Sequence, residues 1–230
     1  MSNKTKMQIQ VNEIKLRIQA DGGSFFANDN ISKYLKEKDI EVIQKNAEEC
    51  IKNLLNALII DVDNDHNTKE TAKRVAKMYI QEVFKGRYLP QPKITDFPNA
   101  KDLDQIYTIG PISVRSACSH HMVPIVGNAW IGVIPSDRVI GISKFNRLTD
   151  WVMSRPQIQE ESTIQLADEI EKIIKPKALA VVVKSSHMCM SWRGVKDNDS
   201  TMTTSVMRGL FKEDEGARNE FLNIIRGQKY

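Results

Sequence analysis

The chain has 230 residues, of which 41% are hydrophobic and 27% are charged, a balance typical of a globular protein that can bury a core. Its formal net charge of +4 is modest, and Lys and Arg are interleaved with Asp and Glu, so no nucleic-acid partner is expected. No apolar run reaches the roughly 20 residues of a membrane helix, and the polar stretch 1–10 lacks the apolar core of a secretory signal. We therefore expect a cytoplasmic protein with no membrane partner.

The N-terminal part of the chain shows two kinds of pattern. Residues 1–37 are weakly patterned, and Asp21-Gly22-Gly23-Ser24 is typical of a turn, so we expect a flexible or loosely packed segment. Residues 38–92 are expected to form a helical region. Apolar residues recur there at three- and four-residue steps, which predicts helices over 39–60 and 69–85.

The three cysteines, Cys50, Cys118 and Cys189, are an odd and sparse set that argues against a disulfide framework. Cys50 lies on the apolar stripe of the first expected helix, for which Asp39 is a plausible N-cap. We therefore expect Cys50 to be a small buried side chain and not a metal ligand. Cys118 and Cys189 lie beside histidines, where metal binding becomes an alternative to burial.

After Pro90-Gln91-Pro92, which marks a linker, the hydrophobic period changes to two, and we assign residues 93–230 to one domain. In chain order we expect strands over 104–116 and 123–135, helices over 143–154 and 156–174 with Pro156 in the first turn, strands over 178–193 and 201–211, and a helix over 214–226. Strands and helices are grouped and do not alternate, which predicts an α+β fold with an antiparallel sheet.

The densest chemical signal is Cys118-Ser119-His120-His121. Zinc favours Cys sulfur and His nitrogen, and a Cys-x-x-His spacing lets both reach one ion. The alternative is a surface loop that carries adjacent histidines.

A second signal is His187-Met188-Cys189 in the expected strand 178–193. Side chains alternate between the faces of a strand. We expect one face to carry His187, Cys189, Ser191 and Arg193, and the core face to carry Met188, Met190 and Trp192. The alternative is a buried structural cysteine beside a hydrogen-bonded histidine.

Together the two motifs suggest a Cys2His zinc site, in which a fourth position stays open for water, as in catalytic zinc centres. Zinc would lower the pKa of that water to about 7. One further histidine from each motif would remain for proton transfer. The remaining histidine, His66, lies in a polar turn and is expected to be solvated.

Two weaker signals lie at expected helix starts. In Ser143-Lys144-Phe145-Asn146-Arg147, the two cations share a face near free backbone amides, as in a phosphate site. The alternative is a solvated helix end, which is the usual role of basic residues on an exposed helix. In Gln157-Ile158-Gln159-Glu160, the carboxylate can accept two hydrogen bonds from the N1–H and N2–H edge of guanine. It can equally be an acidic residue that answers the helix dipole.

In this order the motifs resemble GTP cyclohydrolase I. The resemblance runs from about Thr71 to Phe221-Leu222, and residues 1–60 carry little of it. Its most specific stretches are Cys118-Ser119-His120-His121, Gly141-Ile142-Ser143-Lys144-Phe145-Asn146-Arg147, Arg155-Pro156-Gln157-Ile158-Gln159-Glu160 and His187-Met188-Cys189-Met190-Ser191-Trp192-Arg193-Gly194.

The resemblance implies a zinc enzyme that hydrolyses GTP at guanine C8, releases formate and forms 7,8-dihydroneopterin triphosphate. That reaction is a first step toward pterins and folate or toward deazaguanines. The implied zinc ligands are Cys118, His121 and Cys189, and the implied acid–base residues are His120 and His187. The implied GTP contacts are Gln159 and Glu160 at the guanine, and Ser143, Lys144, Arg147, Arg193 and Arg74 at the triphosphate.

The resemblance also implies the tunnelling fold, in which antiparallel sheets of several subunits join into a barrel with helices packed on one side. N-terminal helices precede that domain here. The implied assembly is a homodecamer whose active sites lie between subunits. Pairing of edge strands across subunits would also protect the open edges of the sheet.

Ser119 departs from the family, which usually has Glu between the cysteine and the histidine pair. The departure removes a negative charge but no metal ligand, so zinc binding is expected to persist. It favours one alternative, a relative that acts on another purine or pterin. A second alternative is a non-catalytic nucleotide-binding homologue. A zinc nucleobase deaminase is not expected, because the His-x-Glu and Pro-Cys-x-x-Cys signature is absent.

Overall fold

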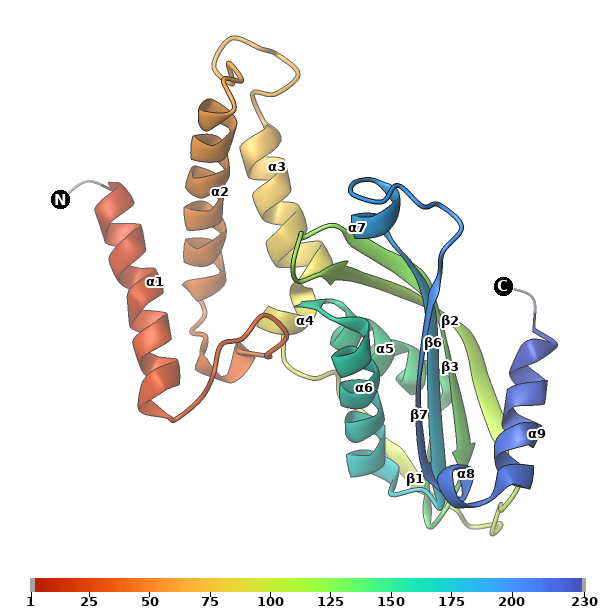
Figure 1. Ribbon diagram of the computed structural model, residues 1–230. Coiled ribbons are helices and arrows are strands. Elements are labelled where there is room, and N and C mark those ends of the chain that lie inside the picture. The colour runs from red at the N-terminus through yellow and green to blue at the C-terminus, as the bar shows by residue number, and fades with distance from the viewer. Residues whose placement is uncertain (1–2, 229–230) are drawn as a thin grey trace. The chain divides into compact units, whose positions relative to one another are not determined.

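The computed structural model describes residues 3–228, which divide into two compact units at Pro90. The first unit is helical (Figure 1). Its elements are α1 (Asn3–Ala20), the short η1 (Ser32–Tyr34), α2 (Asp39–Ala57), α3 (Thr71–Lys77), the π-helical η2 (Met78–Val83) and α4 (Lys85–Tyr88). No helix in the described part of the chain is long and apolar enough to cross a membrane.

Helix α1 occupies a segment for which the sequence predicted no regular element. Its described side chains are mostly exposed, and only Ile14 and Ile18, four residues apart, are fully buried. They pack with Ile31 into a small apolar cluster. Two buried positions among the described side chains of residues 8–20 are too few to give a visible periodic pattern, so propensity and local packing place this helix.

Helix α2 corrects the expectation for Cys50, which is exposed and not buried. None of the helix's side chains is fully buried, and Leu54 and Leu58 remain 57% and 60% exposed. The apolar stripe is therefore present in the sequence but is not closed over within this unit. The helix begins at Asp39 with Lys38 as N-cap, one residue before the expected cap.

The second unit holds a five-stranded sheet of order β5-β2-β3-β6-β7 and a two-stranded sheet of β1 and β4. Its strands are β1 (Asp96–Pro98), β2 (Tyr107–Cys118), β3 (Pro124–Ile134), β4 (Arg138–Ile140), β5 (Pro156–Gln157), β6 (Ala178–His187) and β7 (Met202–Gly209). Strands β2, β3, β6 and β7 are antiparallel, and the short β5 runs parallel to the end of β2. An α+β fold with a mainly antiparallel sheet is confirmed.

Helices lie on both faces of this sheet, which differs from the expected one-sided packing (Figure 1). Along β6, Val181 and Val183 join the apolar cluster under α5 (Ile142–Met153) and α6 (Gln159–Ile174). The intervening Val182 joins a second cluster, which also holds Phe211 and Phe221. Those two rings come from α8 (Leu210–Glu213) and α9 (Glu215–Arg226). Alternation along β6 thus supplies apolar side chains to both layers.

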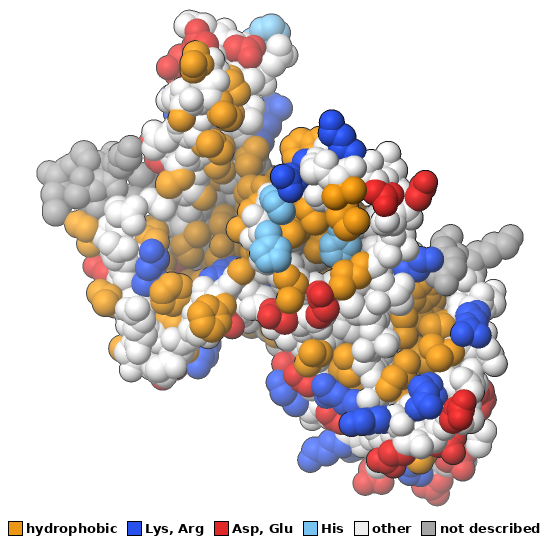
Figure 2. Space-filling view, viewed as in Figure 1, with side chains coloured by type: hydrophobic (Ala, Val, Ile, Leu, Met, Phe, Trp, Pro, Cys, Tyr) orange, Lys and Arg blue, Asp and Glu red, His pale blue; other side chains and the backbone are white. Residues whose placement is uncertain are grey.

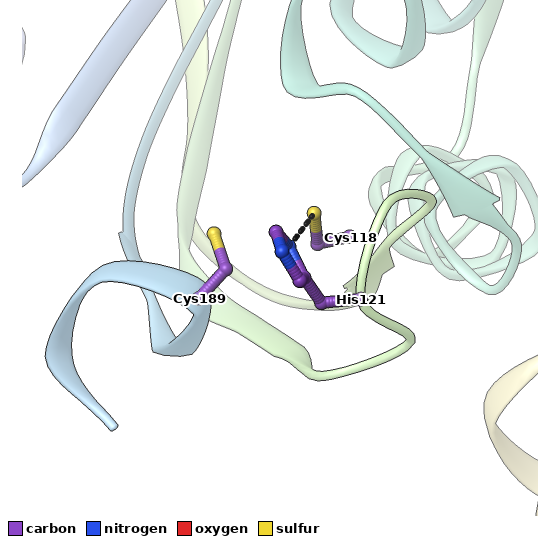
Figure 3. A group of neighbouring side chains, drawn as sticks. All are labelled: Cys118, His121 and Cys189. Carbon is purple, nitrogen blue, oxygen red and sulfur yellow. Dashed lines mark hydrogen bonds between the residues drawn. The ribbon is translucent and has the colours of Figure 1, made fainter. Parts of the chain in front are cut away.

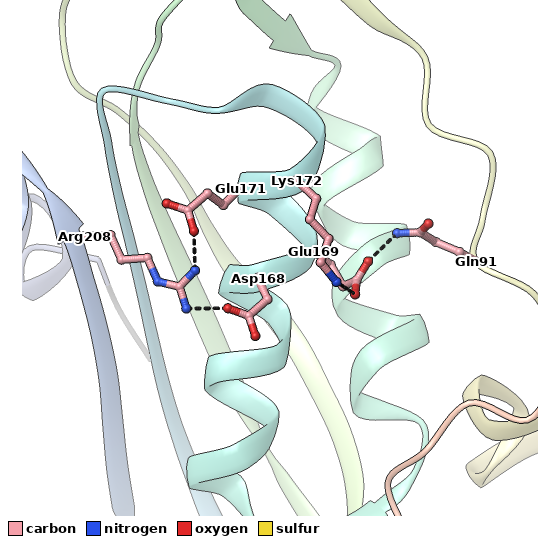
Figure 4. A network of polar contacts seen from close by, with 6 residues as sticks. All are labelled: Gln91, Asp168, Glu169, Glu171, Lys172 and Arg208. Atoms are coloured by element: carbon pink, nitrogen blue, oxygen red, sulfur yellow. Dashed lines mark hydrogen bonds and ion pairs between the residues drawn. The ribbon is translucent and has the colours of Figure 1, made fainter. Parts of the chain in front are cut away.

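Helix α6 is also held to the edge strand β7 by an ion-pair network (Figure 4). The Arg208 guanidinium on β7 donates to Asp168 and Glu171 on α6, each at 2.5 Å. Neighbouring Glu169 pairs with Lys172 at 2.7 Å. Asp168 and Glu171 belong to the C-terminal half of α6, and Arg208 pairs with Leu179 near the start of β6. The Arg208 contacts therefore hold that half of α6 to the sheet, at the end away from His187.

Two expected boundaries are wrong. Strand β6 ends at His187 and not at residue 193, because its neighbour β3 begins at Pro124 and the last pair is Ile125 with His187. The chain then forms the helical turn α7 (Met188–Ser191). Pro156 lies in β5, paired with Ala117, and not in a helix, which begins only at Gln159.

Candidate active site

The end of β2 and the turn that follows it supply the first motif. The Cys118 amide donates to the Val123 carbonyl at 2.9 Å, and the Met122 amide donates to the Cys118 carbonyl at 2.8 Å. The tight turn between them exposes His120 and His121, whereas Cys118 stays buried at 5% exposure. One sulfur and two imidazoles are thereby presented at one end of the sheet.

The second motif meets the first in space. Cys189 lies in α7, and its sulfur, the Cys118 sulfur and a ring nitrogen of His121 all lie within 4.8 Å of one another. Figure 3 shows the three side chains converging from α7, the end of β2 and the following turn. The histidines gather on one exposed face of this unit, as Figure 2 shows. Three of the candidate ligands are therefore brought together.

The donor set and its spacing fit zinc. Cys118 Sγ lies 4.0 Å from His121 Nδ1. In a tetrahedral centre with Zn–S near 2.3 Å, neighbouring ligand atoms are about 3.5–3.8 Å apart, so closure by less than about 1 Å would complete the geometry. Two sulfurs and one imidazole with an exposed side are typical of a catalytic and not a structural zinc centre.

The charges near Cys189 also favour a bound cation. Burial raises the pKa of the Cys189 thiol, and the neighbouring Cys118 raises it further, whereas the Arg193 guanidinium lowers it. Two sulfurs held this closely would repel each other as thiolates. A metal cation removes that repulsion, because thiolates bind metals in their deprotonated form.

Arg193 reaches the same cluster, with its Nη1 atom 3.2 Å from Nε2 of His121. A neutral imidazole that binds a metal through Nδ1 carries its proton on Nε2. One that binds the metal through Nε2 has no lone pair left on that atom. In neither case can Nε2 accept a hydrogen bond from Arg193. The contact and metal binding by His121 are therefore mutually exclusive, and a bound metal frees the guanidinium for an anion.

His187 and Glu160 lie beside the metal cluster. His187 ends β6, half-buried, and its Nε2 atom is 2.8 Å from Oε1 of Gln159 at the start of α6. Burial lowers the pKa of His187, and the Glu160 carboxylate partly opposes that shift. An imidazole and an exposed carboxylate thus stand next to the proposed ligands, although the shared strand face expected for His187 and Cys189 is wrong.

The helical turn also changes the expected core set. Met188, Met190 and Trp192 were expected to face the core, but they are 41%, 38% and 74% exposed. Their exposure follows from the end of β6, since α7 has no strand partner and no sheet face to cover. The region around Cys189 is therefore an apolar rim and not a packed interior.

The phosphate candidates are not brought to this cluster within one chain. Ser143, Lys144 and Arg147 lie in the first half of α5, where the Phe145 ring packs on Tyr107, with centroids 6.4 Å apart. Tyr107 begins the 12-residue β2 and Cys118 ends it. At about 3.3 Å per residue the strand spans roughly 35 Å, so the two groups lie at opposite ends of it.

Comparison with known proteins decides the family. The sequence model described as GTP cyclohydrolase I matches residues 47–226. A GTP cyclohydrolase 1 of Edwardsiella ictaluri is 40% identical over 174 residues, which cover 75% of this chain and 79% of that protein. One of Flavobacterium johnsoniae is 39% identical over 191 residues, covering 83% of each. The chain belongs to the GTP cyclohydrolase I family.

A solved structure, the archaeosine synthase QueF-Like in the apo form, overlaps 52% of this chain and 97% of that one. Its TM-score of 0.36 and 16% identity are too low to assign a fold from it. Family membership therefore rests on the sequence relatives. The matched region contains both motifs of the metal cluster as well as α3, where Arg74 lies in the first unit.

Within the GTP cyclohydrolase I chain, some supporting residues carry no recognisable sequence signal. The buried Gln157 amide donates to Ser116 Oγ at 3.1 Å and to the Val152 and Met153 carbonyls at 3.0 and 3.1 Å. These bonds hold β5 against the end of β2 next to Cys118. A glutamine one residue before a helix cap gives no pattern that separates this buried role from a surface one.

Proposed function

We propose that this chain is a zinc-dependent GTP cyclohydrolase I, which converts GTP and water to formate and 7,8-dihydroneopterin triphosphate. The observation that carries the proposal is the convergence of Cys118, His121 and Cys189 inside the region matched by the family. His120 and His187 accompany that cluster, which supports proton transfer at the same place.

Cys118, His121 and Cys189 would hold the zinc, with the exposed side of the cluster left for water and substrate. When bound, zinc supplies Lewis acidity that activates water at neutral pH. The protein supplies the rest: it fixes the ligand directions through the turn after β2 and through α7, and it excludes bulk water from the Cys118 side.

The two remaining histidines would move protons. His120 Nδ1 lies 3.7 Å from Cys118 Sγ, and His187 lies next to Glu160, so both imidazoles border the place where guanine C8 must sit. Water adds at C8, the C8–N9 bond opens as an imidazole protonates N9, and a second water releases the C8 carbon as formate. Glu160 would hold the guanine through its N1–H and N2–H edge. The ribose opens and rearranges to a ketose, whose carbonyl condenses with the freed amine and releases one water, which closes the second ring.

The triphosphate would be held by cations drawn from more than one copy of the chain. Arg193 belongs to the metal cluster, whereas Ser143, Lys144 and Arg147 lie at the far end of β2 in the same chain. A nucleoside triphosphate is too short to reach from one end of that strand to the other. The separation therefore supports an active site between subunits, to which Arg74 would also contribute.

We propose that the assembly is the homodecamer of the tunnelling fold, in the cytoplasm. Strand β7 forms one edge of the sheet, and β5 covers only the last two residues of β2 on the other. Both edges thus present unpaired backbone groups that a second copy can pair. The product would feed pterin and folate or deazaguanine synthesis.

The direct test is incubation of the purified, zinc-loaded protein with GTP, followed by assays of formate and of the fluorescent oxidised pterin. Equal amounts of both are expected. Formate without a pterin, or formate release from another purine but not from GTP, would favour the alternative that Ser119 suggests, a relative that acts on another purine or pterin. GTP binding with neither product would favour a non-catalytic homologue.

A further inference from the structure

The most completely bonded polar side chain near the site is Gln159, whose residue is only 3% exposed. Its Nε2 atom lies 3.0 Å from the Val183 carbonyl, 3.2 Å from the Met202 carbonyl and 3.1 Å from Thr204 Oγ1. Its Oε1 atom lies 2.8 Å from His187 Nε2. Both ends of this amide are therefore engaged inside the chain.

The surroundings decide which end of the amide is which. Backbone carbonyls only accept hydrogen bonds, so the end that faces Val183 and Met202 must be the NH2 group. With the amide reversed, its oxygen would face two carbonyl oxygens at about 3 Å, and a buried oxygen pair without a proton is strongly unfavourable. The amide orientation follows from the backbone of β6 and β7 and needs no assumption about hydrogen positions.

Two hydroxyl groups support the same direction. Thr163 Oγ1 donates to the Gln159 carbonyl at 2.7 Å and is 2.7 Å from Thr204 Oγ1. Because the Thr163 proton is used on that carbonyl, Thr204 must donate to Thr163. Thr204 Oγ1 is then left to accept from the Gln159 NH2 group, and every member of this network has one consistent role.

The Gln159 oxygen can only accept, so His187 must carry a proton on Nε2. We propose that Gln159 is a positioning residue, which holds the His187 proton on Nε2 and leaves Nδ1 as the ring atom that exchanges a proton with the substrate. This inference rests on the proposed function, in which His187 transfers protons. It also differs from the expected contact of the Gln159 side chain with guanine, because the residue is buried and both ends of its amide already bond within the chain.

A spectroscopic experiment tests the proton position without any turnover. The zinc-loaded protein, labelled with 15N only in histidine, is sedimented and its ring nitrogens are observed by solid-state NMR at pH 8. The chain has 4 histidines, and His187 is assigned by the signal that the His187→Gln variant loses. We expect a protonated Nε2 and a bare Nδ1. A protonated Nδ1 with a bare Nε2 would overturn the proposal, whether or not the protein releases formate.

Variants then separate positioning from stability. Gln159→Met keeps the length of the side chain and removes both hydrogen-bonding ends. We expect mixed protonation of His187 in its spectrum, and a kcat lowered about 10- to 100-fold with KM for GTP within about threefold, as for other residues that orient a functional imidazole.

The matched control is Ser162→Ala. Ser162 is 1% exposed and donates to the Gln159 carbonyl at 2.9 Å, so its loss perturbs the same buried corner without touching the amide. We expect kcat within about twofold of the native value. An equal loss of kcat in both variants, or an unchanged His187 spectrum in Gln159→Met, would overturn the positioning role. If Gln159→Met does not fold, the native spectrum alone still decides the proton position.

Discussion

The roughly 35 Å of strand between Cys118 and the start of α5 leads to a sharp prediction about subunits. One variant, Cys118→Ala, loses the metal cluster but keeps α5 intact. The other, Lys144→Ala with Arg147→Ala, keeps the metal cluster but loses the proposed phosphate cations. Each is expected to be nearly inactive by itself, and none of the three substituted residues belongs to the two apolar clusters that pack the sheet against its helices.

Mixing the two variants should restore a fraction of the activity, and the number of chains that contribute to each site sets that fraction. A complete site needs the metal cluster of one chain and α5 of another. With equal amounts and random assembly, the chain that supplies the metal cluster has it intact about half of the time, and the chain that supplies α5 has it intact about half of the time. About one quarter of the sites should therefore be complete. If all groups came from the same chain, no site in the mixture could be complete.

The assay is formate release from GTP by doubly tagged mixed oligomers, formed by co-expression and purified through both tags. The matched control mixes Cys118→Ala with Cys189→Ala. Because these two ligands meet within one chain, their mixture should stay inactive. Recovery in the control, or none in the test mixture, would refute the assignment of the two groups to different subunits.

Three further outcomes are expected. Cys189→Ala should lose most of the bound zinc, measured by atomic absorption, whereas Cys50→Ala should keep all of it, because Cys50 is exposed and outside the cluster; full zinc in Cys189→Ala would remove that ligand. Glu160→Gln should weaken GTP binding by about 1–3 kcal/mol in calorimetry while leaving inorganic triphosphate binding unchanged; equal losses for both ligands would contradict a guanine contact. Arg208→Met should lower the free energy of unfolding by about 1 kcal/mol in urea at low salt and by less at high salt; a salt-independent loss would mean that packing, and not the two ion pairs, is responsible.

Hydrophobic periodicity predicted most of the second unit because its elements are amphipathic. The expected strands over 104–116 and 123–135 correspond to β2 and β3 within a few residues. The helices α5 and α6 also follow the expected spans closely. Each of these elements supplies side chains to the apolar cluster between the sheet and the helices α5 and α6, so its hydrophobic pattern reflects that packing.

The hydrophobic pattern gave the wrong structure beyond the end of β6, where the chain has no neighbouring strand to pair with. Residues 188–193 alternate as a strand would, but β3 begins at Pro124 and offers no pairing beyond Ile125. Without a ladder the chain turns into α7, and that turn carries Cys189 to Cys118 and His121. A Cys2His cluster was predictable from residue type and spacing, and the family resemblance selected His121 from the two adjacent histidines. The backbone that joins the two motifs was not predictable, because it depends on where another strand starts.

Gln159 shows a different limit, since a buried amide and a ligand-binding amide look the same in a sequence. The sequence motif led to the expectation that Gln159 and Glu160 both contact guanine. Consecutive residues at a helix start, however, point in directions about 100° apart. Glu160 is exposed, whereas Gln159 turns inward to two carbonyls, a hydroxyl and His187. Under the proposed function, adjacent residues of one motif would have different roles: the outward carboxylate would bind the substrate, and the inward amide would set the proton position of His187. Only the contacts with β6 and β7 in the structure distinguish the buried amide from a ligand-binding one.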